Sequence, residues 1–376
     1  MEYIVTCNKD YGKLAVHELQ TADPSFQLLR WLDEGVGLGA SQLEPHELAR
    51  LAAEMPVIFV RHMFAVTAVT DYGKGQAQIE AICREQLDRA LSFCVQTRYA
   101  VGEEKDPHMT EALSQTLVKD GFDLDVASGA QIVSLYGAQG KYYVGVGPAQ
   151  YNISHWKGGM PHYSSSDAFQ FISRAEYKLK EALEHFAIDL HPMKRAADLG
   201  AAPGGWTKVL SDGGLEVSSI DPSRLNPVIE KRPNVRYYHM TVEEYLTLPL
   251  NDTFDIVVND MKMDVAESMA IIQSFHDRIT PGGVVVMTLK LPREFSYKDL
   301  RRQLDSLMGF ERLGCRQLFH NRSEVTAVWK QKPYLPEEAA AVSARKPVRF
   351  GKKPNAKKNP PKKGQLSKKL MRKYGR

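Results

Sequence analysis

The C-terminal half of the chain alternates short apolar runs with amphipathic stretches, and this alternation predicts its architecture. Helices are expected over residues 206–210, 265–279 and 297–308, between apolar runs that predict strands. The expected strands are Arg195–Leu199, Glu216–Ile220, Val235–Met240, Phe254–Asn259, Gly283–Leu289, Gly314–His320 and Glu324–Lys330. Because strands alternate with helices, the pattern favours an α/β domain with a doubly wound, mainly parallel sheet.

The last two expected strands are separated only by residues 321–323, which is too short for a crossover connection. These two strands should therefore pair antiparallel. In an open sheet of this kind, ligands bind outside the carboxyl ends of the strands. Gly200, Asp221 and Asp260 are all expected at that edge.

The N-terminal half is less regular. Its pattern predicts strands at 3–6 and 58–69, helices at 76–93 and 110–120, and a hairpin of 131–136 with 141–147. This α+β pattern contains no catalytic spacing. Residues 155–161 are interpreted as a connector to the C-terminal domain.

The segment Ala197–Trp206 is the most informative stretch, because it predicts a strand, a glycine-rich turn and a helix start. Gly200, Gly204 and Gly205 carry no Cβ, so the backbone can approach a nucleotide-like ligand closely. Asp221 lies 21 positions beyond Gly200, at the expected end of the next strand. A carboxylate there can accept hydrogen bonds from both ribose hydroxyls of an adenosine. The turn lacks the G-x-G-x-x-G spacing, which argues against NAD.

Four charged residues form a second constellation. Lys178 lies on an expected helix before the first of these strands, Asp260 and Lys290 follow two apolar strands, and Glu324 opens the last strand. An apolar strand has no packing reason to end in a lysine. Each residue alone is a common surface residue, and the combination at strand ends is what favours a catalytic site.

These motifs resemble the FtsJ-type RNA ribose 2′-O-methyltransferases. The similarity rests on S-R-A-x-Y-K-L at 173–179, D-L-G-A-A-P-G-G-W at 198–206, N-D-M at 259–261, the strand-end Lys290 and R-S-E-V at 322–325. Within that group, residues 289–292 and 316–326 are most similar to the RlmM-type enzymes of bacterial 23S rRNA.

The resemblance implies a Rossmann-like, seven-stranded methyltransferase domain that uses S-adenosylmethionine (SAM) and acts on RNA. It implies a catalytic tetrad of Lys178, Asp260, Lys290 and Glu324. The implied SAM-binding residues are Asp198, Gly200, Ala201, Pro203, Gly204, Gly205, Trp206, Asp221 and Asp260. It also implies four parts: a ferredoxin-like region at 1–59, a THUMP-like RNA-binding domain at 60–159, the methyltransferase domain at 160–332, and a linker and tail at 333–376.

Each member of the implied tetrad has a plausible task. Lys290 accepts the proton of the ribose hydroxyl, or orients the hydroxyl if the lysine stays charged. Repulsion from Lys178 is expected to lower the pKa of Lys290 towards the working pH. Asp260 and Glu324 hold the two ammonium groups. Trp206 and Tyr177 are either base-stacking or core aromatic residues.

Charge divides the chain. Residues 345–376 contain 14 Lys and Arg and no acidic residue, which leaves 35 basic and 45 acidic residues, a formal charge of −10, in residues 1–344. Such a cationic block is expected to be disordered and to bind polyanions such as RNA, the alternative being a solubilising tail. This tail is not part of the family pattern.

The cysteines, the apolar runs and the histidines of the sequence bear on the location of the protein and on metal binding. The four cysteines are scattered, and the chain shows neither a signal peptide nor an apolar run that could span a membrane, so a reducing cytoplasmic location is expected. His239, His276 and His320 lack the spacing of metal ligands, and no metal is predicted.

Three functions therefore compete. The first is an RNA ribose 2′-O-methyltransferase acting on large-subunit rRNA. The second is a SAM-dependent methyltransferase with another acceptor, against which Lys178, Lys290 and Glu324 count. The third is an RNA-binding or ribosome-assembly factor that keeps the fold only as a scaffold. The complete tetrad and the glycine loop favour the first.

Overall fold

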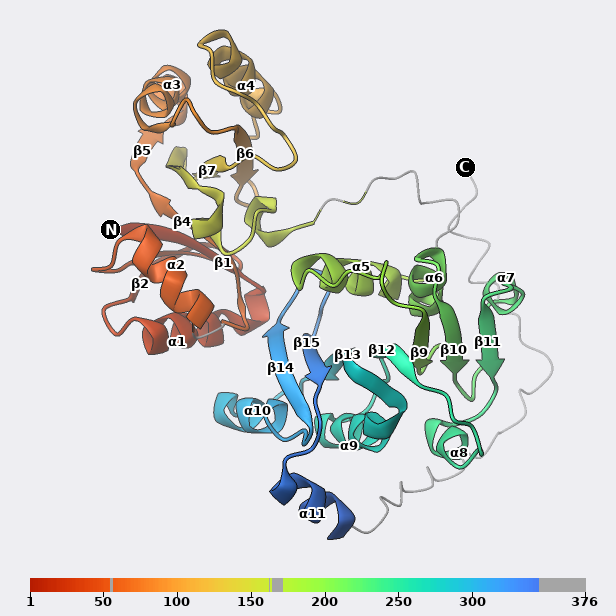
Figure 1. The fold of residues 1–376 in the computed structure, drawn as a ribbon. Helices are drawn as coiled ribbons and strands as arrows, with labels where there is room; N and C mark the ends of the chain where they lie inside the picture. Colours follow the sequence, from red (N-terminus) through yellow and green to blue (C-terminus); the bar gives the residue numbers. More distant parts are fainter. Residues whose placement is uncertain (55–56, 162, 164–171, 345–376) are drawn as a thin grey trace, which may run out of the picture. The chain divides into compact units, whose positions relative to one another are not determined.

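The structure, a computed structural model, describes residues 1–54, 57–161, 163 and 172–344. Its C-terminal part is built on a seven-stranded sheet with the order β11-β10-β9-β12-β13-β15-β14 (Figure 1). The strands are β9 (Arg195–Leu199), β10 (Glu216–Ile220), β11 (Val235–Tyr238), β12 (Phe254–Asn259), β13 (Ile279–Lys290), β14 (Phe310–Arg316) and β15 (Glu324–Gln331). All pairs are parallel except those of β15, which runs antiparallel to β13 and β14. The predicted α/β sheet with an antiparallel last hairpin is confirmed.

Helices cover both faces of this sheet. Figure 1 shows α5 (Ala175–His185) and α6 (Gly205–Asp212) over one face, and α8 (Val242–Leu246), α9 (Val265–Phe275) and α10 (Tyr297–Leu304) over the other. Two further helices are α7 (Pro227–Glu230) and α11 (Pro336–Ala344). Central strands are apolar because both of their faces are covered. Ile256 and Val258 of β12, for example, pack with Leu179 of α5 and Leu210 of α6 in one core cluster.

The strand expected at 314–320 was placed too late in the chain. The strand β14 ends at Arg316, and residues 317–323 form the loop to β15. The apolar residues Leu318 and Phe319 suggested a continuing strand. However, the side chains of Gln317 and Asn321 bind backbone groups within the loop, which offers the chain an alternative to strand pairing. Seven residues are still too few for a crossover, so the antiparallel prediction holds.

The N-terminal part contains two four-stranded sheets. The first has the order β2-β3-β1-β4 and is antiparallel throughout, with β1 (Glu2–Cys7), β2 (Gln27–Asp33), β3 (Val36–Ala40) and β4 (Val60–Val66). It is accompanied by α1 (Gly12–Ala22) and α2 (Pro45–Glu54). Because β4 begins at Val60 and pairs with β1, the first sheet crosses the boundary expected at 59/60. Strand pairing favours a boundary after Val66.

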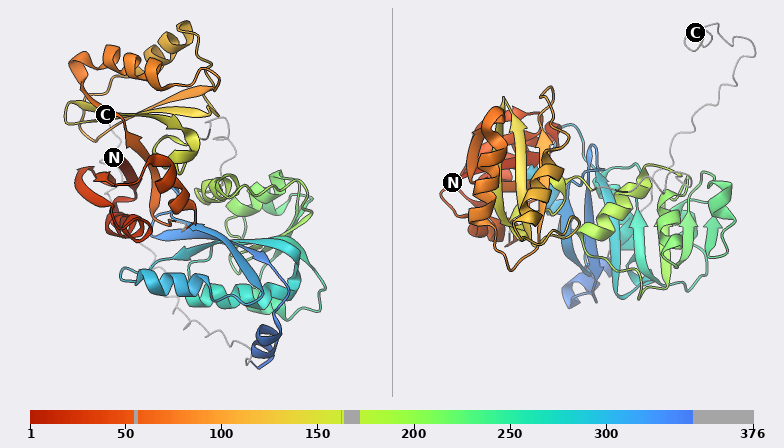
Figure 2. Two further views of the ribbon diagram at one scale, coloured as in Figure 1. Left: turned by 60° about the vertical axis from the view of Figure 1, so that its left-hand side comes forward. Right: turned by 90° about the horizontal axis from the view of Figure 1, so that it is seen from above.

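The second sheet has the order β5-β8-β7-β6, with β5 (Ala68–Asp71), β6 (Phe93–Tyr99), β7 (Gln131–Ala138) and β8 (Lys141–Pro148). Figure 2 shows α3 (Gly75–Gln86) and α4 (Met109–Lys119) along one face of it. The hairpin of β7 and β8 is confirmed. Two expectations were wrong: the run at 58–69 is divided between two strands in different sheets, and the expected helix 76–93 ends at Gln86.

Within the described residues, no helix is long and apolar enough to cross a membrane. The four cysteines are buried free thiols. The cationic residues 345–376 lie outside the described residues.

Candidate active site

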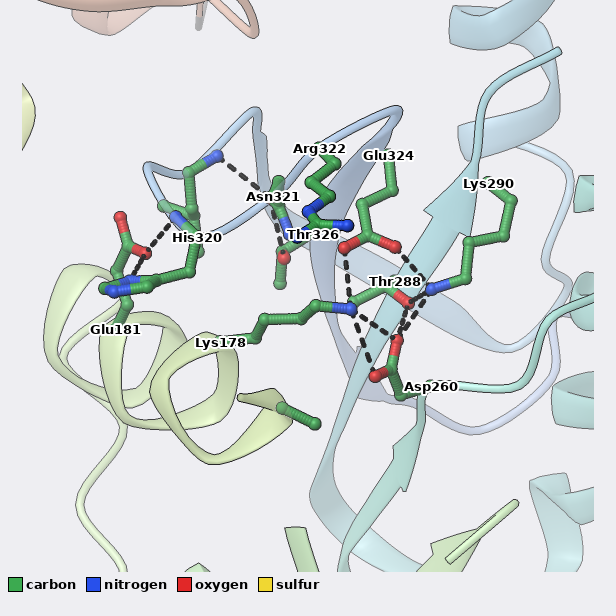
Figure 3. Close-up of polar contacts among 12 residues, drawn as sticks. Lys178, Glu181, Asp260, Thr288, Lys290, His320, Asn321, Arg322, Glu324 and Thr326 are labelled. Carbon is green, nitrogen blue, oxygen red and sulfur yellow. Dashed lines mark hydrogen bonds and ion pairs between the residues drawn. The ribbon is translucent and has the colours of Figure 1, made fainter. Parts of the chain in front are cut away.

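The carboxyl ends of the parallel strands bring the sequence-predicted residues to one edge of the sheet. Asp260 directly follows β12, and Lys290 is the last residue of β13. Glu324 arrives at the same edge from the opposite direction, because it opens the antiparallel β15 and stands directly across from Lys290 in the register. Lys178 reaches this edge from α5 (Figure 3). Four residues from separate parts of the chain therefore meet.

The four side chains form a closed ring of ion pairs, named here the KDKE cluster. Nζ of Lys178 lies 3.2 Å from Asp260 Oδ2 and 2.7 Å from Glu324 Oε1. Nζ of Lys290 lies 2.7 Å from Asp260 Oδ1 and also pairs with Glu324 Oε2. The side chains of Lys178 and Lys290 remain 17% and 23% exposed, so the cluster is accessible at the surface of the domain.

Thr288 joins this cluster, although the sequence did not single it out. Its hydroxyl donates to Asp260 and accepts from Lys290 Nζ at 2.7 Å. Because side chains alternate along a strand, Thr288 shares a face of β13 with Lys290 two residues later. This spacing of two residues was the signal in the sequence that could have identified Thr288.

The charges around Lys290 correct the prediction that its pKa is lowered. Burial by itself would lower the pKa of Lys290, but attraction to Asp260 and Glu324 and the hydrogen bonds to both outweigh it, so the pKa is raised. The expected lowering of the Lys290 pKa by Lys178 is therefore wrong. The pKa of Asp260 is lowered, because the two lysines overcome the opposing effect of burial. The resting cluster favours a charged Lys290.

The glycine loop 200–205 connects β9 to α6 beside the cluster. Gly200 and Gly204 adopt positive φ of +78° and +112°, a region that other residues rarely enter. A Cβ on Gly200 would also lie 2.3 Å from Met261 Cγ. The loop therefore requires glycine at Gly200 for two separate reasons, and its backbone lies close to the residues that follow β12.

Asp221 directly follows β10 and faces the glycine loop. Its carboxylate accepts hydrogen bonds from the backbone N–H of Ala202 at 3.1 Å and of Ser223 at 2.6 Å. These contacts fix the carboxylate at the edge of the sheet while leaving lone pairs available, because a carboxylate has about four acceptor positions. The contact of Asp221 with an adenosine ribose stays a prediction.

Two residues of the loop motif have their side chains inside the domain. Trp206 is buried in the core, and its indole N–H donates to Ala175 O at 2.7 Å, which joins α6 to α5. Of the two roles considered for Trp206, the structure therefore supports the core aromatic. Asp198 is 1% exposed and accepts a 2.7 Å hydrogen bond from Thr207 Oγ1. Both side chains therefore support the glycine loop from the interior of the domain.

Burial raises the pKa of Asp198 to about 7. Because this folded-state pKa exceeds the ordinary value of 3.8, the contribution to stability is complete below pH 3.8 and is lost as the pH rises through about 7. Asp198→Asn keeps an oxygen that can accept from Thr207 but cannot ionise. We expect its melting temperature, relative to wild type, to be higher at about pH 8 than at about pH 5. If the melting temperatures of the variant and the wild type differed by the same amount at both pH values, the raised pKa of Asp198 would be contradicted.

His320 lies near the cluster, on the loop 317–323. Its Nδ1 contacts Glu181 Oε2 at 2.7 Å (Figure 3). Its ring also stacks on Tyr177, with the ring centroids 5.2 Å apart. Glu181 follows Lys178 by three residues on α5, and this helical spacing was its only sequence signal. Within the part of the chain that the structure describes, no group of three or more His, Cys, Asp or Glu residues is arranged to hold a metal ion.

Comparison with known proteins finds similarity to methyltransferases. Residues 171–315 match the FtsJ-like methyltransferase family. Three similar proteins, each named Ribosomal RNA large subunit methyltransferase M, come from Shewanella denitrificans, Shewanella amazonensis and Halorhodospira halophila. The first is 27% identical over 74% of this chain and 81% of its own length. The second is 28% identical over 78% and 86%. The third is 30% identical, but the match spans only 49% of this chain and 52% of the relative. The chain thus carries an FtsJ-like methyltransferase domain and is a distant homologue of these proteins.

Proposed function

We propose that this protein transfers a methyl group from SAM to a ribose 2′-hydroxyl of RNA, and that large-subunit rRNA is its substrate. The observation that carries the proposal is the closed KDKE cluster at the carboxyl ends of the parallel strands, beside the glycine loop. The names of the distant homologues support rRNA as the substrate.

The residues at this edge fit SAM, which supplies an activated methyl group on a sulfonium. The glycine loop provides a close backbone approach, and Asp221 provides acceptors for ribose hydroxyls. Asn259, at the end of β12, is fully buried, and within the described residues its Nδ2 has no hydrogen-bond partner. A buried donor without a partner is costly, and a ligand with acceptor atoms at this edge would remove that cost.

In this proposal the KDKE cluster acts on the acceptor. A ribose hydroxyl is a weak nucleophile, so its oxygen must be held in line with the methyl carbon. Because the pKa of Lys290 is raised, the charged ammonium that orients the acceptor is favoured over a neutral amine that accepts the proton. The ammonium donates a hydrogen bond to the 2′-oxygen and thereby directs a lone pair of that oxygen towards the methyl carbon. Asp260 and Glu324 hold Lys290 in place, and Lys178 bridges the same two carboxylates. Methyl transfer would break the bond between the methyl carbon and the sulfonium sulfur as the new C–O bond forms, and the hydroxyl proton would pass to solvent water.

The N-terminal sheets are proposed to contact RNA outside the methylated nucleotide, with the second sheet as the THUMP-like region. The division into a ferredoxin-like region, a THUMP-like domain, a methyltransferase domain and a tail is likewise kept as a proposal, with its first boundary moved to the end of β4. RNA context is commonly recognised through loops and appended domains.

The proposed function is tested by incubating the protein with tritiated SAM and rRNA and mapping the labelled nucleotide. We expect label at one ribose of large-subunit rRNA. Label on a base or on protein would favour another acceptor, and the absence of transfer, together with RNA binding, would favour the assembly factor.

Deleting residues 345–376 should raise the apparent KM for RNA at low salt and leave the methylated position unchanged. The 14 cations of this segment can contact phosphates, which carry no base information, while the −10 charge of residues 1–344 repels RNA. The KM of full-length and truncated protein should be compared at two salt concentrations. The truncated protein should depend less on salt. A shift in the methylated ribose would show instead that the tail selects the target.

A further inference from the structure

The loop 317–323, which leads into Glu324, is held from one side by a buried carboxylate. Glu181 of α5 has a side chain that is only 1% exposed. It accepts hydrogen bonds from the backbone N–H of Phe319 at 2.6 Å and of His320 at 2.9 Å, in addition to its contact with the imidazole (Figure 3). Hydrogen bonds to a buried charge are strong, so this side of the loop is fixed to the helix that carries Lys178.

A half-buried arginine holds the same loop by donating hydrogen bonds to the carbonyl groups of the loop. Arg61 of β4 donates from Nε to Gln317 O at 3.1 Å and from Nη2 to Leu318 O at 2.9 Å. Its guanidinium also lies 5.6 Å from the ring centroid of Phe319. Burial lowers the pKa of Arg61 to about 10. With amides bound by Glu181 and carbonyls bound by Arg61, the loop is preorganised, and the side chains that it presents stand on a rigid support.

A hollow of about 270 Å³ lies between this loop and the start of α5. It is lined by Arg174, Ala175, Lys178, His320, Arg322 and Glu324. Two of these residues, Lys178 and Glu324, belong to the KDKE cluster, so the hollow opens directly beside the proposed position of the acceptor hydroxyl. Its lining is dominated by cationic groups.

Only some of the charged side chains that line this hollow are paired with one another. Lys178 is paired with Asp260 and Glu324. Arg174 and Arg322 are exposed, and within the described residues neither guanidinium has an ion pair or hydrogen bond. A guanidinium presents five N–H donors in a planar fork that matches phosphate oxygens. The hollow thus offers two arginines that have no partner among the described residues, and their guanidinium groups suit a phosphate.

We propose that this hollow binds the phosphodiester on the 3′ side of the methylated ribose, with Arg322 as its main ligand. The inference rests on the proposed function, because it takes an RNA ribose as the acceptor. In a ribonucleotide, the carbon that bears the 3′-phosphate is bonded to the carbon that bears the 2′-hydroxyl. When the hydroxyl sits at the KDKE cluster, the phosphate must therefore occupy space next to it, and the hollow is that space. A phosphate held here fixes the orientation of the ribose without reading its base.

The test uses full-length protein and a short RNA that contains the mapped methylation site. A second RNA carries a neutral methylphosphonate in place of the 3′ phosphodiester. We expect Arg322→Ala to raise the KM for the natural RNA by about tenfold or more, the usual effect of losing charge-assisted hydrogen bonds, with little change in kcat or SAM affinity. The methylphosphonate should raise the KM of the wild type similarly, and combining both changes should cause little further loss, because they remove the same contact.

Arg236→Ala is the matched control, since Arg236 is an exposed arginine on β11, at the far edge of the sheet. It should keep the full methylphosphonate effect. The subsite is refuted if the losses from Arg322→Ala and methylphosphonate multiply, or if Arg322→Ala leaves the KM unchanged while the wild type methylates ribose. Failure of the wild type to methylate any ribose would refute the proposed function itself, and the subsite with it.

Discussion

Replacing Lys290 with alanine should lower the turnover of methyl transfer by about 100-fold or more, while SAM affinity and folding stay near those of the wild type. Lys290 contacts Asp260 and Thr288 at 2.7 Å each and also pairs with Glu324, so it has three polar partners at this edge, as many as Asp260 has. Its proposed task is to orient the acceptor hydroxyl. Adenosine recognition is assigned to other residues, which is why turnover and SAM binding should separate.

The experiment measures turnover at saturating SAM and RNA, SAM affinity by calorimetry, and the melting temperature. Lys298→Ala is a suitable control, because Lys298 is an exposed lysine on α10. It should retain wild-type turnover. If Lys290→Ala also retained it, the ribose mechanism would have to be abandoned in favour of a different acceptor chemistry.

Asp221→Ala should weaken SAM binding by about 1–3 kcal/mol, or roughly 5- to 150-fold, the cost of losing charge-assisted hydrogen bonds to the adenosine ribose. The carboxylate is already oriented by the N–H groups of Ala202 and Ser223, so little further ordering is needed when a ligand binds. Calorimetric titration should show one site per chain for the wild type, without competition from NAD.

Glu216→Ala provides the control for this titration, since Glu216 is an exposed carboxylate at the opposite end of the same strand. Its SAM affinity should equal that of the wild type. An unchanged affinity in Asp221→Ala would remove Asp221 from the cofactor site. Loss of the Ala202 contact could also alter the loop, so the melting temperature of the variant should be compared as well.

The sequence predicted the sheet and the meeting of the four charged residues, because parallel strands bring their carboxyl ends to one edge. Asp260 and Lys290 follow apolar strands that are buried on both faces, and such strands have a clear pattern. Glu324 was placed correctly because only antiparallel pairing fits a short connection, and this pairing sets it opposite Lys290. The glycine loop was recognisable because Gly200 and Gly204 must adopt positive φ.

The remaining features depend on contacts between distant residues. Arg61 binds Gln317 and Leu318 across more than 250 positions of sequence, and no local pattern predicts such a contact. The end of β14 was misplaced for the same reason, since hydrogen bonds to Glu181 and Arg61 hold the following residues as a loop. The pKa of Lys290 was predicted in the wrong direction because the sequence gives no distances. In the structure both Asp260 and Glu324 contact the Lys290 ammonium, and their attraction outweighs the effect of burial.

The central claim, that the acceptor is a ribose 2′-oxygen, is tested most directly by alkaline hydrolysis of RNA labelled with tritiated SAM. Alkali cleaves RNA through the free 2′-hydroxyl, so a methylated ribose protects the bond on its 3′ side. The account predicts that the label is recovered in alkali-resistant dinucleotides, and that Lys290→Ala protein produces them about 100-fold more slowly or slower still. Recovery of the label in mononucleotides would place the methyl group on a base and would contradict the account.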